Sequence, residues 1–296
     1  MAPLDIEPPS VLLSGLAMPE SARWHQDRVW FAHWGTGEVV AVDLDGKSEV
    51  VAQGPPGLGW SIDWLPDGRL LVTGATLMRQ ERDGSMVQHA DLSGVATHGW
   101  NEIVLDPRGN IYLDGMTFDL AGGGAPQPGI IAVVTPDGST REVADGIEFP
   151  NGMVVTPDGS TLIVAESFAR RLTAFDIADD ASLSNRRVWA QDVGPDGICL
   201  DDDGCIWTGS ARTRANTGRA DAPAGELLRV AEGGGILDRI ELDQPAFSCA
   251  IGGPDGRTLA ILGTDWRGFE QVDSVLAERT GRVLITSAPA PAALRT

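Results

Sequence analysis

The chain has 296 residues, and its 22 Lys and Arg against 42 Asp and Glu give a formal net charge of −20 at pH 7. A field of this sign repels phosphate backbones and anionic lipids, which argues against nucleic acids and membrane surfaces as partners. The chain has no run of eighteen apolar residues and does not open with the basic and apolar segments of a secretory signal, so we expect a cytoplasmic protein.

In chain order, a turn followed by a short β-type run recurs from one end of the chain to the other. Gly, Pro and Asp supply the backbone dihedrals that a tight reversal needs, so each pair predicts a hairpin. The turns are Gln26-Asp27-Arg28, Pro66-Asp67-Gly68, Pro107-Arg108-Gly109, Pro157-Asp158-Gly159, Asp202-Asp203-Gly204 and Pro254-Asp255-Gly256. The runs that follow them cover residues 29–31, 70–72, 111–113, 162–164, 206–207 and 259–261.

These six copies lie roughly 40 to 50 residues apart, which is the period of a propeller blade. Second turns inside the copies indicate about four strands in each, so we predict an all-β fold, a single six-bladed β-propeller. Segments 12–16 and 283–285 lie outside the six copies and are expected to complete one blade from both termini. The best helical candidate, 275–278, is too short to predict a helix. We expect one domain over residues 1–296, with short flexible ends at about 1–9 and 288–296.

The innermost strand of each blade runs along the central channel, so equivalent positions at the start of these strands converge on the axis. Counting eight residues back from each turn gives one position per copy. The six residues at these positions are Glu20, Trp60, Asn101, Asn151, Asp196 and Ser248. Four of them carry amide or carboxylate oxygens, and the exceptions are Trp60 and Ser248.

Two interpretations of these oxygen-bearing residues compete. Asn151-Gly152 and Asp196-Gly197 could be simple turn dipeptides. Alternatively the side chains share a metal ion, because clustered axial carboxylates repel each other unless a cation lies between them. Oxygen donors without imidazole or thiolate suit Ca²⁺ first, and also Mg²⁺ or Mn²⁺, while Zn²⁺ and Fe²⁺ stay open. The sequence therefore predicts one divalent cation as cofactor.

With these residues in view, the chain resembles the SMP-30/gluconolactonase/LRE family of six-bladed propellers. The resemblance is carried by four segments in order at blade spacing, 19–24, 101–106, 149–154 and 195–200. It implies that Glu20, Asn151 and Asp196 bind a divalent cation. It also implies that Asn101 contacts the substrate or completes the metal site, and that the activity is hydrolysis of a lactone.

The sequence departs from the family pattern in ways that concern the substrate. The usual opening Glu-Gly-Pro-x-Trp reads Glu20-Ser21-Ala22-Arg23-Trp24 here. Sugar-lactone members often have Arg two residues before the substrate Asn and Asp directly after it, whereas this chain has Gly99 and Glu102. Losing an Arg removes a group with several hydrogen-bond donors that suits hydroxyl-rich substrates.

We therefore expect a small-molecule lactone that is less hydroxylated than gluconolactone. Trp60, Trp100 and His98 are the predicted substrate-binding residues at the mouth of the channel.

The predicted catalytic residues are Asp196, Asn101 and Glu102. Asp196 is the preferred base for a water molecule activated by the cation, and Glu102 is the second candidate. Two alternatives stay open at this point. One is metal-dependent hydrolysis of another ester or a phosphotriester. The other is a non-catalytic ligand-binding propeller with a structural metal. The sequence does not indicate an oligomeric state.

Overall fold

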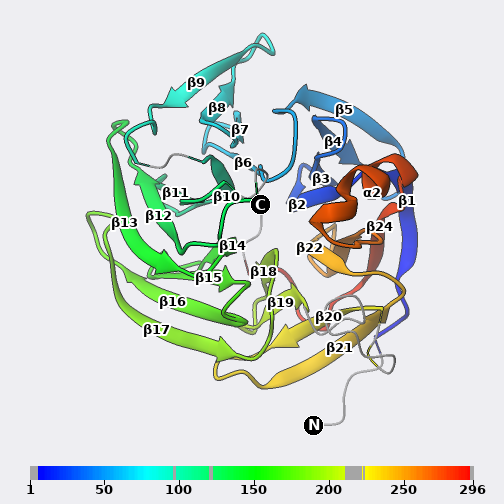
Figure 1. Cartoon of the computed structure of the whole chain (residues 1–296). Coiled ribbons are helices and arrows are strands. Elements are labelled where there is room, and N and C mark those ends of the chain that lie inside the picture. The colour runs from blue at the N-terminus through cyan, green and yellow to red at the C-terminus, as the bar shows by residue number, and fades with distance from the viewer. Residues whose placement is uncertain (1–5, 96–97, 120–122, 211–221, 223, 294–296) are drawn as a thin grey trace.

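In the computed structural model, which describes residues 6–95, 98–119, 123–210, 222 and 224–293, six antiparallel sheets of four strands stand around a central axis (Figure 1). This arrangement confirms the predicted all-β, six-bladed propeller. Strands follow one another within each sheet in chain order, except in the last blade. The first and second strands of each blade are joined by short connections, as the closely spaced turns predict, whereas longer loops join β11 (Ile111–Gly115) to β12 (Gly129–Val134) and β23 (Thr258–Gly263) to β24 (Gly281–Ser287).

The blades, numbered in chain order, have the following strands. Blade 1 contains β2 (Pro19–His25), β3 (Arg28–His33), β4 (Glu38–Val42) and β5 (Ser48–Gln53). Blade 2 contains β6 (Ile62–Trp64), β7 (Leu70–Val72), β8 (Leu77–Gln80) and β9 (Met86–Ala90). Blade 3 contains β10 (Trp100–Leu105), β11 (Ile111–Gly115), β12 (Gly129–Val134) and β13 (Thr140–Ile147). Blade 4 contains β14 (Pro150–Val155), β15 (Thr161–Glu166), β16 (Arg171–Ile177) and β17 (Leu183–Gln191). Blade 5 contains β18 (Ile198–Leu200), β19 (Ile206–Gly209), β20 (Gly225–Val230) and β21 (Ile236–Leu242).

Blade 6 is built from both ends of the chain. It contains β22 (Ala246–Gly252), β23 (Thr258–Gly263), β24 (Gly281–Ser287) and, at its outer edge, β1 (Ser10–Leu16). β1 pairs antiparallel with β24, so the two segments predicted to close the ring do so. The loop between β23 and β24 holds a short 3-10 turn, η1 (Phe269–Gln271), and the helix α2 (Val272–Glu278). The sequence pattern does not predict this helix, because seven residues make too few turns to show a helical period. No helix in the described ranges is long and apolar enough to cross a membrane.

A separate apolar core lies between each pair of neighbouring blades. Between blades 2 and 3, for example, Leu71 and Leu77 share one buried cluster with Ile103 and Leu113. The cluster between blades 6 and 1 closes the ring in the same way as the other five interfaces. Burying one such side chain contributes roughly 1.5 to 3 kcal/mol, so these interfaces stabilise the ring of blades.

The predicted turns connect the first and second strands of the blades. Their glycines adopt positive φ, with Gly68 at 82° and Gly159 at 69°, and such values favour glycine. These turns lie at the end of each inner strand opposite to the axial positions. We call that end of the ring the turn face and the other end, which carries the β23–β24 loop, the site face. In Figure 1 α2 lies in front, so the site face looks toward the viewer.

Candidate functional site

The axial positions predicted from the repeat lie where the regular pairing of the inner strands is interrupted. In blades 1, 3, 4 and 6 the first strand has a register shift there, and in blades 2 and 5 pairing begins only after the axial residue. Bulges of this kind bend a strand and redirect its side chains. The shifts fall between Glu20 and Arg23, Trp100 and Ile103, Pro150 and Met153, and Ala246 and Ser248.

The glycines that follow Asn151 and Asp196 serve close packing of blades and not a turn. Neither Gly152 nor Gly197 is among the residues with positive φ. A Cβ at Gly152 would lie 2.5 Å from the Ile198 backbone nitrogen, and one at Gly197 would lie 2.7 Å from the Phe247 carbonyl oxygen. The turn-dipeptide interpretation is therefore wrong for both pairs. The glycines let blades 4, 5 and 6 approach one another at the axis.

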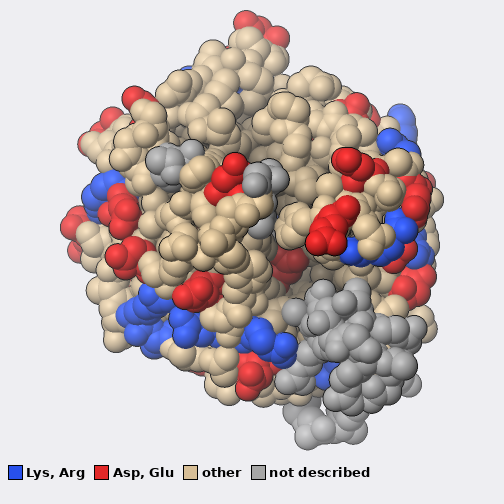
Figure 2. Space-filling model, in the orientation of Figure 1, with Lys and Arg blue, Asp and Glu red and all other residues tan. Residues whose placement is uncertain are grey.

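The carboxyl group of Glu20 is buried and interacts electrostatically with that of the half-buried Asp196. Glu20 is 2% exposed, and burial, followed by the charges of Asp196 and Glu102, raises the pKa of its carboxyl well above its usual range. Burial and the charge of Glu102 raise the pKa of Asp196 to about 7. Figure 2 shows acidic atoms in the hollow near the centre of the site face. These side chains repel each other, as expected for a site that needs a cation.

Asn151 joins this group through its amide. Its side chain donates a hydrogen bond to Asp196, and its Oδ1 accepts one from the Gly152 N–H at 3.0 Å. The amide nitrogen also lies 3.4 Å from Ser167 Oγ, which in turn donates to the Pro195 carbonyl oxygen at 2.8 Å. Ser167 thus links blade 4 to the residue that precedes Asp196. Nothing in the sequence pattern singled it out.

Arg23 spans from blade 1 to blade 3. Its Nη2 donates to Glu102 Oε2 at 3.1 Å and to the Ile103 carbonyl oxygen at 2.9 Å. Arg23 occupies the variable position of the family motif, so the motif does not indicate this contact. The ion pair holds the Glu102 carboxylate, which reduces its freedom to act as the base.

Asn101 and Glu102 are held in the β10 bulge by a buried carboxylate behind them. Asp114, on β11, accepts a hydrogen bond from the Glu102 N–H at 3.1 Å, and the Asn101 backbone also bonds to it. Burial and the charge of Glu102 raise the pKa of Asp114 well above its usual range. The Asn101 side-chain oxygen lies 3.7 Å from where a Cβ on Gly59 would be. The Asn101 side chain is therefore directed toward the connection that leads into blade 2.

The two tryptophans predicted to line the substrate pocket are core residues. Trp60 and Trp100 are each 1% exposed and belong to the clusters between blades 1 and 2 and between blades 2 and 3. Trp60 Nε1 donates to the Gly57 carbonyl oxygen at 3.1 Å, so its polar group is used internally. His98 lies exposed in the loop before β10. A substrate contact by any of the three stays a prediction.

Gly99 explains why the arginine of the sugar-lactone pattern is missing here. Its φ is 94°, a conformation that L-residues rarely adopt, and a Cβ would lie 3.4 Å from the Gly74 carbonyl oxygen. An arginine at position 99 would therefore require a different loop between blades 2 and 3.

The donors at the axis fit a hard divalent cation. The buried Glu20 carboxylate and the half-buried Asp196 carboxylate lie there with the Asn151 amide, and a cation would offset the repulsion between the two carboxylates. In the described ranges no three His, Cys, Asp or Glu side chains form a metal-binding group by themselves. The predicted set has only two such residues, Glu20 and Asp196, with Asn151 and Asn101 beside them.

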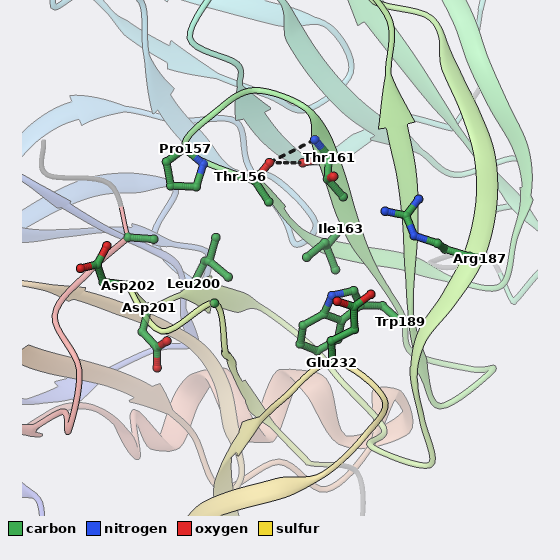
Figure 3. Close-up of a pocket in the computed structure, with 12 residues that line it drawn as sticks. Thr156, Pro157, Thr161, Ile163, Arg187, Trp189, Leu200, Asp201, Asp202 and Glu232 are labelled. Carbon is green, nitrogen blue, oxygen red and sulfur yellow. Dashed lines mark hydrogen bonds between the residues drawn. The ribbon is translucent and has the colours of Figure 1, made fainter.

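A cavity of about 270 Å³ lies elsewhere, between blades 4 and 5 on the turn face (Figure 3). Ile163, Trp189 and Leu200 provide apolar surface, and Arg187 and Glu232 carry charge. None of the predicted site residues lines this cavity, so we do not connect it with the axial site.

Comparison with known proteins places the chain in a family. The model of the SMP-30/gluconolactonase/LRE-like region matches residues 18–264. A pentonolactonase from Haloferax volcanii is 26% identical over 202 residues, which cover 57% of this chain and 66% of the relative. A diisopropyl-fluorophosphatase from Loligo vulgaris is 28% identical over 191 residues, which cover 56% of this chain and 61% of the relative. Each alignment spans a little under two thirds of the relative's length.

Solved structures share the fold over nearly the whole chain. A luciferin-regenerating enzyme has a TM-score of 0.77 at 18% identity, covering 97% of this chain and 98% of that one. A structure titled as the calcium-binding protein regucalcin, from Agrobacterium tumefaciens, has a TM-score of 0.76 at 20% identity, covering 98% and 96%. The matched residues 18–264 include all four motif segments, and the chain belongs to the SMP-30/gluconolactonase/LRE-like family.

Proposed function

We propose that this protein is a divalent-metal-dependent hydrolase that opens lactone rings. The observation that carries the proposal is the convergence of the buried Glu20 carboxylate, the half-buried Asp196 carboxylate and the Asn151 amide at the start of the inner strands. Lactonases are among the chain's relatives, which supports hydrolysis as the reaction. Ca²⁺ is the first metal to test, because the donors are oxygens and a structural neighbour is titled a calcium-binding protein.

Glu20, Asn151 and Asp196 would hold the cation, with Asn101 beside them. A bound cation of this kind polarises a carbonyl group and lowers the pKa of a water molecule. Asp196 has two carboxylate oxygens, so one can serve the cation while the other accepts the proton of the attacking water. The Asn101 amide can donate a hydrogen bond to the lactone carbonyl oxygen as negative charge develops there. Glu102 is the weaker candidate for the base because Arg23 binds it.

The substrate would be a small lactone with fewer hydroxyl groups than gluconolactone. Without an arginine at position 99, the site lacks the multiple donors that would replace the water lost from sugar hydroxyls. The backbone of Gly99 supports this view, since its conformation disfavours any side chain there.

Hydrolysis of a phosphotriester is the second candidate. It is favoured by the similarity to the squid diisopropyl-fluorophosphatase over 191 residues. A cation that polarises a carbonyl can equally polarise a phosphoryl oxygen, so the donor set does not separate the two reactions.

An activity panel separates these candidates. Purified protein, treated with chelator and then reloaded with Ca²⁺, is assayed on simple lactones, gluconolactone, aryl esters and phosphotriesters. We expect metal-dependent turnover, with kcat/KM higher for simple lactones than for the other classes. Asp196→Asn should reduce kcat/KM by at least 100-fold, whereas Asp45→Asn, an exposed control of the same chemistry, should leave it unchanged. Metal binding without turnover of any class would contradict the proposal and favour a non-catalytic propeller.

A further inference from the structure

Two groups of aromatic side chains stand beside the axial site on the site face. The first aromatic group consists of Phe118, Phe149 and Phe168, with Phe149 and Phe168 stacked at 4.3 Å between ring centroids. The second aromatic group consists of Phe247, Trp266 and Phe269, in which Trp266 meets both neighbours edge to face at 6.0 and 5.1 Å. Neither group was singled out from the sequence.

The first aromatic group is tied to the predicted ligand Asn151. Phe149 lies two residues before Asn151 and has a φ of 59°, an unusual conformation for a bulky residue. Its carbonyl oxygen accepts from the Ser167 N–H at 3.1 Å, and Ser167 Oγ contacts the Asn151 amide. The connection between β13 and β14 therefore positions both the Asn151 amide and the Phe149 ring, and Phe168, from the connection between β15 and β16, stacks on that ring.

The second aromatic group is tied in the same way to Asp196. The carbonyl oxygen of Phe247 accepts a hydrogen bond from the Gly197 N–H at 2.8 Å. Trp266 and Phe269 come from the β23–β24 loop, which lies over β22 on the site face (Figure 1). Because Asn151 bonds to Asp196, a continuous path of contacts links the two aromatic groups across the axial site.

The exposure of these rings is unusual for this protein. Among the described residues, Phe168 at 51% and Phe269 at 50% are the only aromatic side chains among the exposed large hydrophobic ones. One belongs to each group. Leaving apolar ring surface in water is unfavourable, so rings exposed beside a reactive centre indicate a ligand that covers them.

We propose that the two aromatic groups form the subsite that binds the apolar body of the substrate, and that this body is an aromatic or alicyclic ring attached to the lactone. The inference rests on the proposed function for the position of the lactone carbonyl at the axis. Aromatic rings pair favourably with other rings in stacked or edge-to-face arrangements, and both arrangements are already present in the two groups. A sugar lactone would meet these rings with hydroxyl groups that find no partner.

The test compares two lactones that differ only in the ring body, γ-phenyl-γ-butyrolactone and γ-butyrolactone. In Ca²⁺-loaded protein, Phe168→Ala and Phe269→Ala should each lower kcat/KM for the phenyl lactone about five- to tenfold and change that for γ-butyrolactone less than twofold. Phe168→Leu should fall between wild type and alanine. Val188→Ala, an exposed apolar control remote from the site on blade 4, should alter neither value.

A binding measurement keeps this proposal separate from the proposed function. The lactam 5-phenyl-2-pyrrolidinone cannot be turned over as a lactone, and its affinity is measured by titration calorimetry. If no lactone is hydrolysed but the lactam binds and both alanine variants weaken it at least fivefold, the subsite is supported and the hydrolytic function fails. If lactones are hydrolysed but neither variant changes the phenyl preference or the lactam affinity, the subsite is refuted and the function stands.

Discussion

Ser21 offers a sharp test of how the axial loop of blade 1 is held. Ser21 is fully buried and has a φ of 53°, in the region that favours glycine, which is the residue usual at this position in the family. Its Oγ accepts a hydrogen bond at 3.0 Å from the N–H of Ile62, the first residue of β6. The serine therefore keeps the left-handed backbone of a glycine and adds a link between blades 1 and 2.

The expected magnitudes follow from these two features. Ser21→Ala removes the acceptor and leaves a buried N–H unpaired, which costs about 1 to 3 kcal/mol of unfolding free energy. Ser21→Gly loses the same bond but relieves a left-handed conformation that costs an L-residue roughly 1 to 2 kcal/mol. The greater freedom of glycine in the unfolded chain offsets about 0.4 to 1 kcal/mol of that relief. We therefore expect the order of stability to be wild type, then Ser21→Gly, then Ser21→Ala.

Urea unfolding, monitored by tryptophan fluorescence, measures this order. The transition midpoints can be compared directly if the unfolding free energy depends on urea concentration with the same slope in every variant. Ser10→Ala, which changes an exposed serine at the edge strand β1, is the control and should shift stability by less than about 0.5 kcal/mol. An alanine variant as stable as wild type, or one more stable than the glycine variant, would refute this account of Ser21.

Two further predictions concern the packing of blades and the pH dependence of stability. Gly152→Ala should destabilise the fold by several kcal/mol and weaken metal binding, because its Cβ would meet the Ile198 backbone at 2.5 Å; unfolding and titration calorimetry measure both effects. Burial, followed by the charge of Arg279, lowers the pKa of His33, whose Nε2 accepts from the Ala17 N–H. The unfolded chain therefore binds the proton of this histidine more readily, so the contribution of His33 to stability should fall as pH drops below about 6.5, whereas the raised pKa values of Glu20, Asp114 and Asp196 act in the opposite direction. His33→Gln should reduce that fall in urea midpoints measured from pH 8 to pH 5, and an undiminished fall would assign it to other groups.

The fold could be predicted from the sequence because a propeller repeats one local pattern. Each hairpin needs a turn residue with the right dihedrals and a short apolar run, and both are visible in the sequence. The closure of blade 6 by the two ends of the chain followed from counting strands, and the pairing of β1 with β24 confirms it. The helix α2 was missed because a seven-residue helix in a loop has too few turns to show a periodic pattern.

For the axial site, the sequence predicts which positions along the inner strands lie at the axis, but not where their side chains point. Counting back from the turns finds which residues come to the axis, and Glu20, Asn151 and Asp196 do come together there. The packing of the indoles could not be found this way, because the register gives a position along the strand and not the direction of a side chain. Trp60 therefore lies in a core between blades although it shares the register.

The partners that come from other blades were also beyond the sequence. Arg23 reaches Glu102 across 79 residues of chain, and a single sequence carries no signal for such a pair. The aromatic groups had a weak signal, since Phe149 and Phe247 each lie just before an axial position.

The most direct test of the central claim is a calorimetric titration of Ca²⁺ into chelator-treated protein. The account predicts one site per chain in the wild type. Glu20→Gln and Asp196→Asn each remove a charge from the ligand set, and Asn151→Ala removes an amide oxygen, so each should weaken binding at least tenfold. Asp45→Asn should leave the affinity unchanged. Wild-type affinity in all three ligand variants would show that the cation is not held at the propeller axis and would contradict the account.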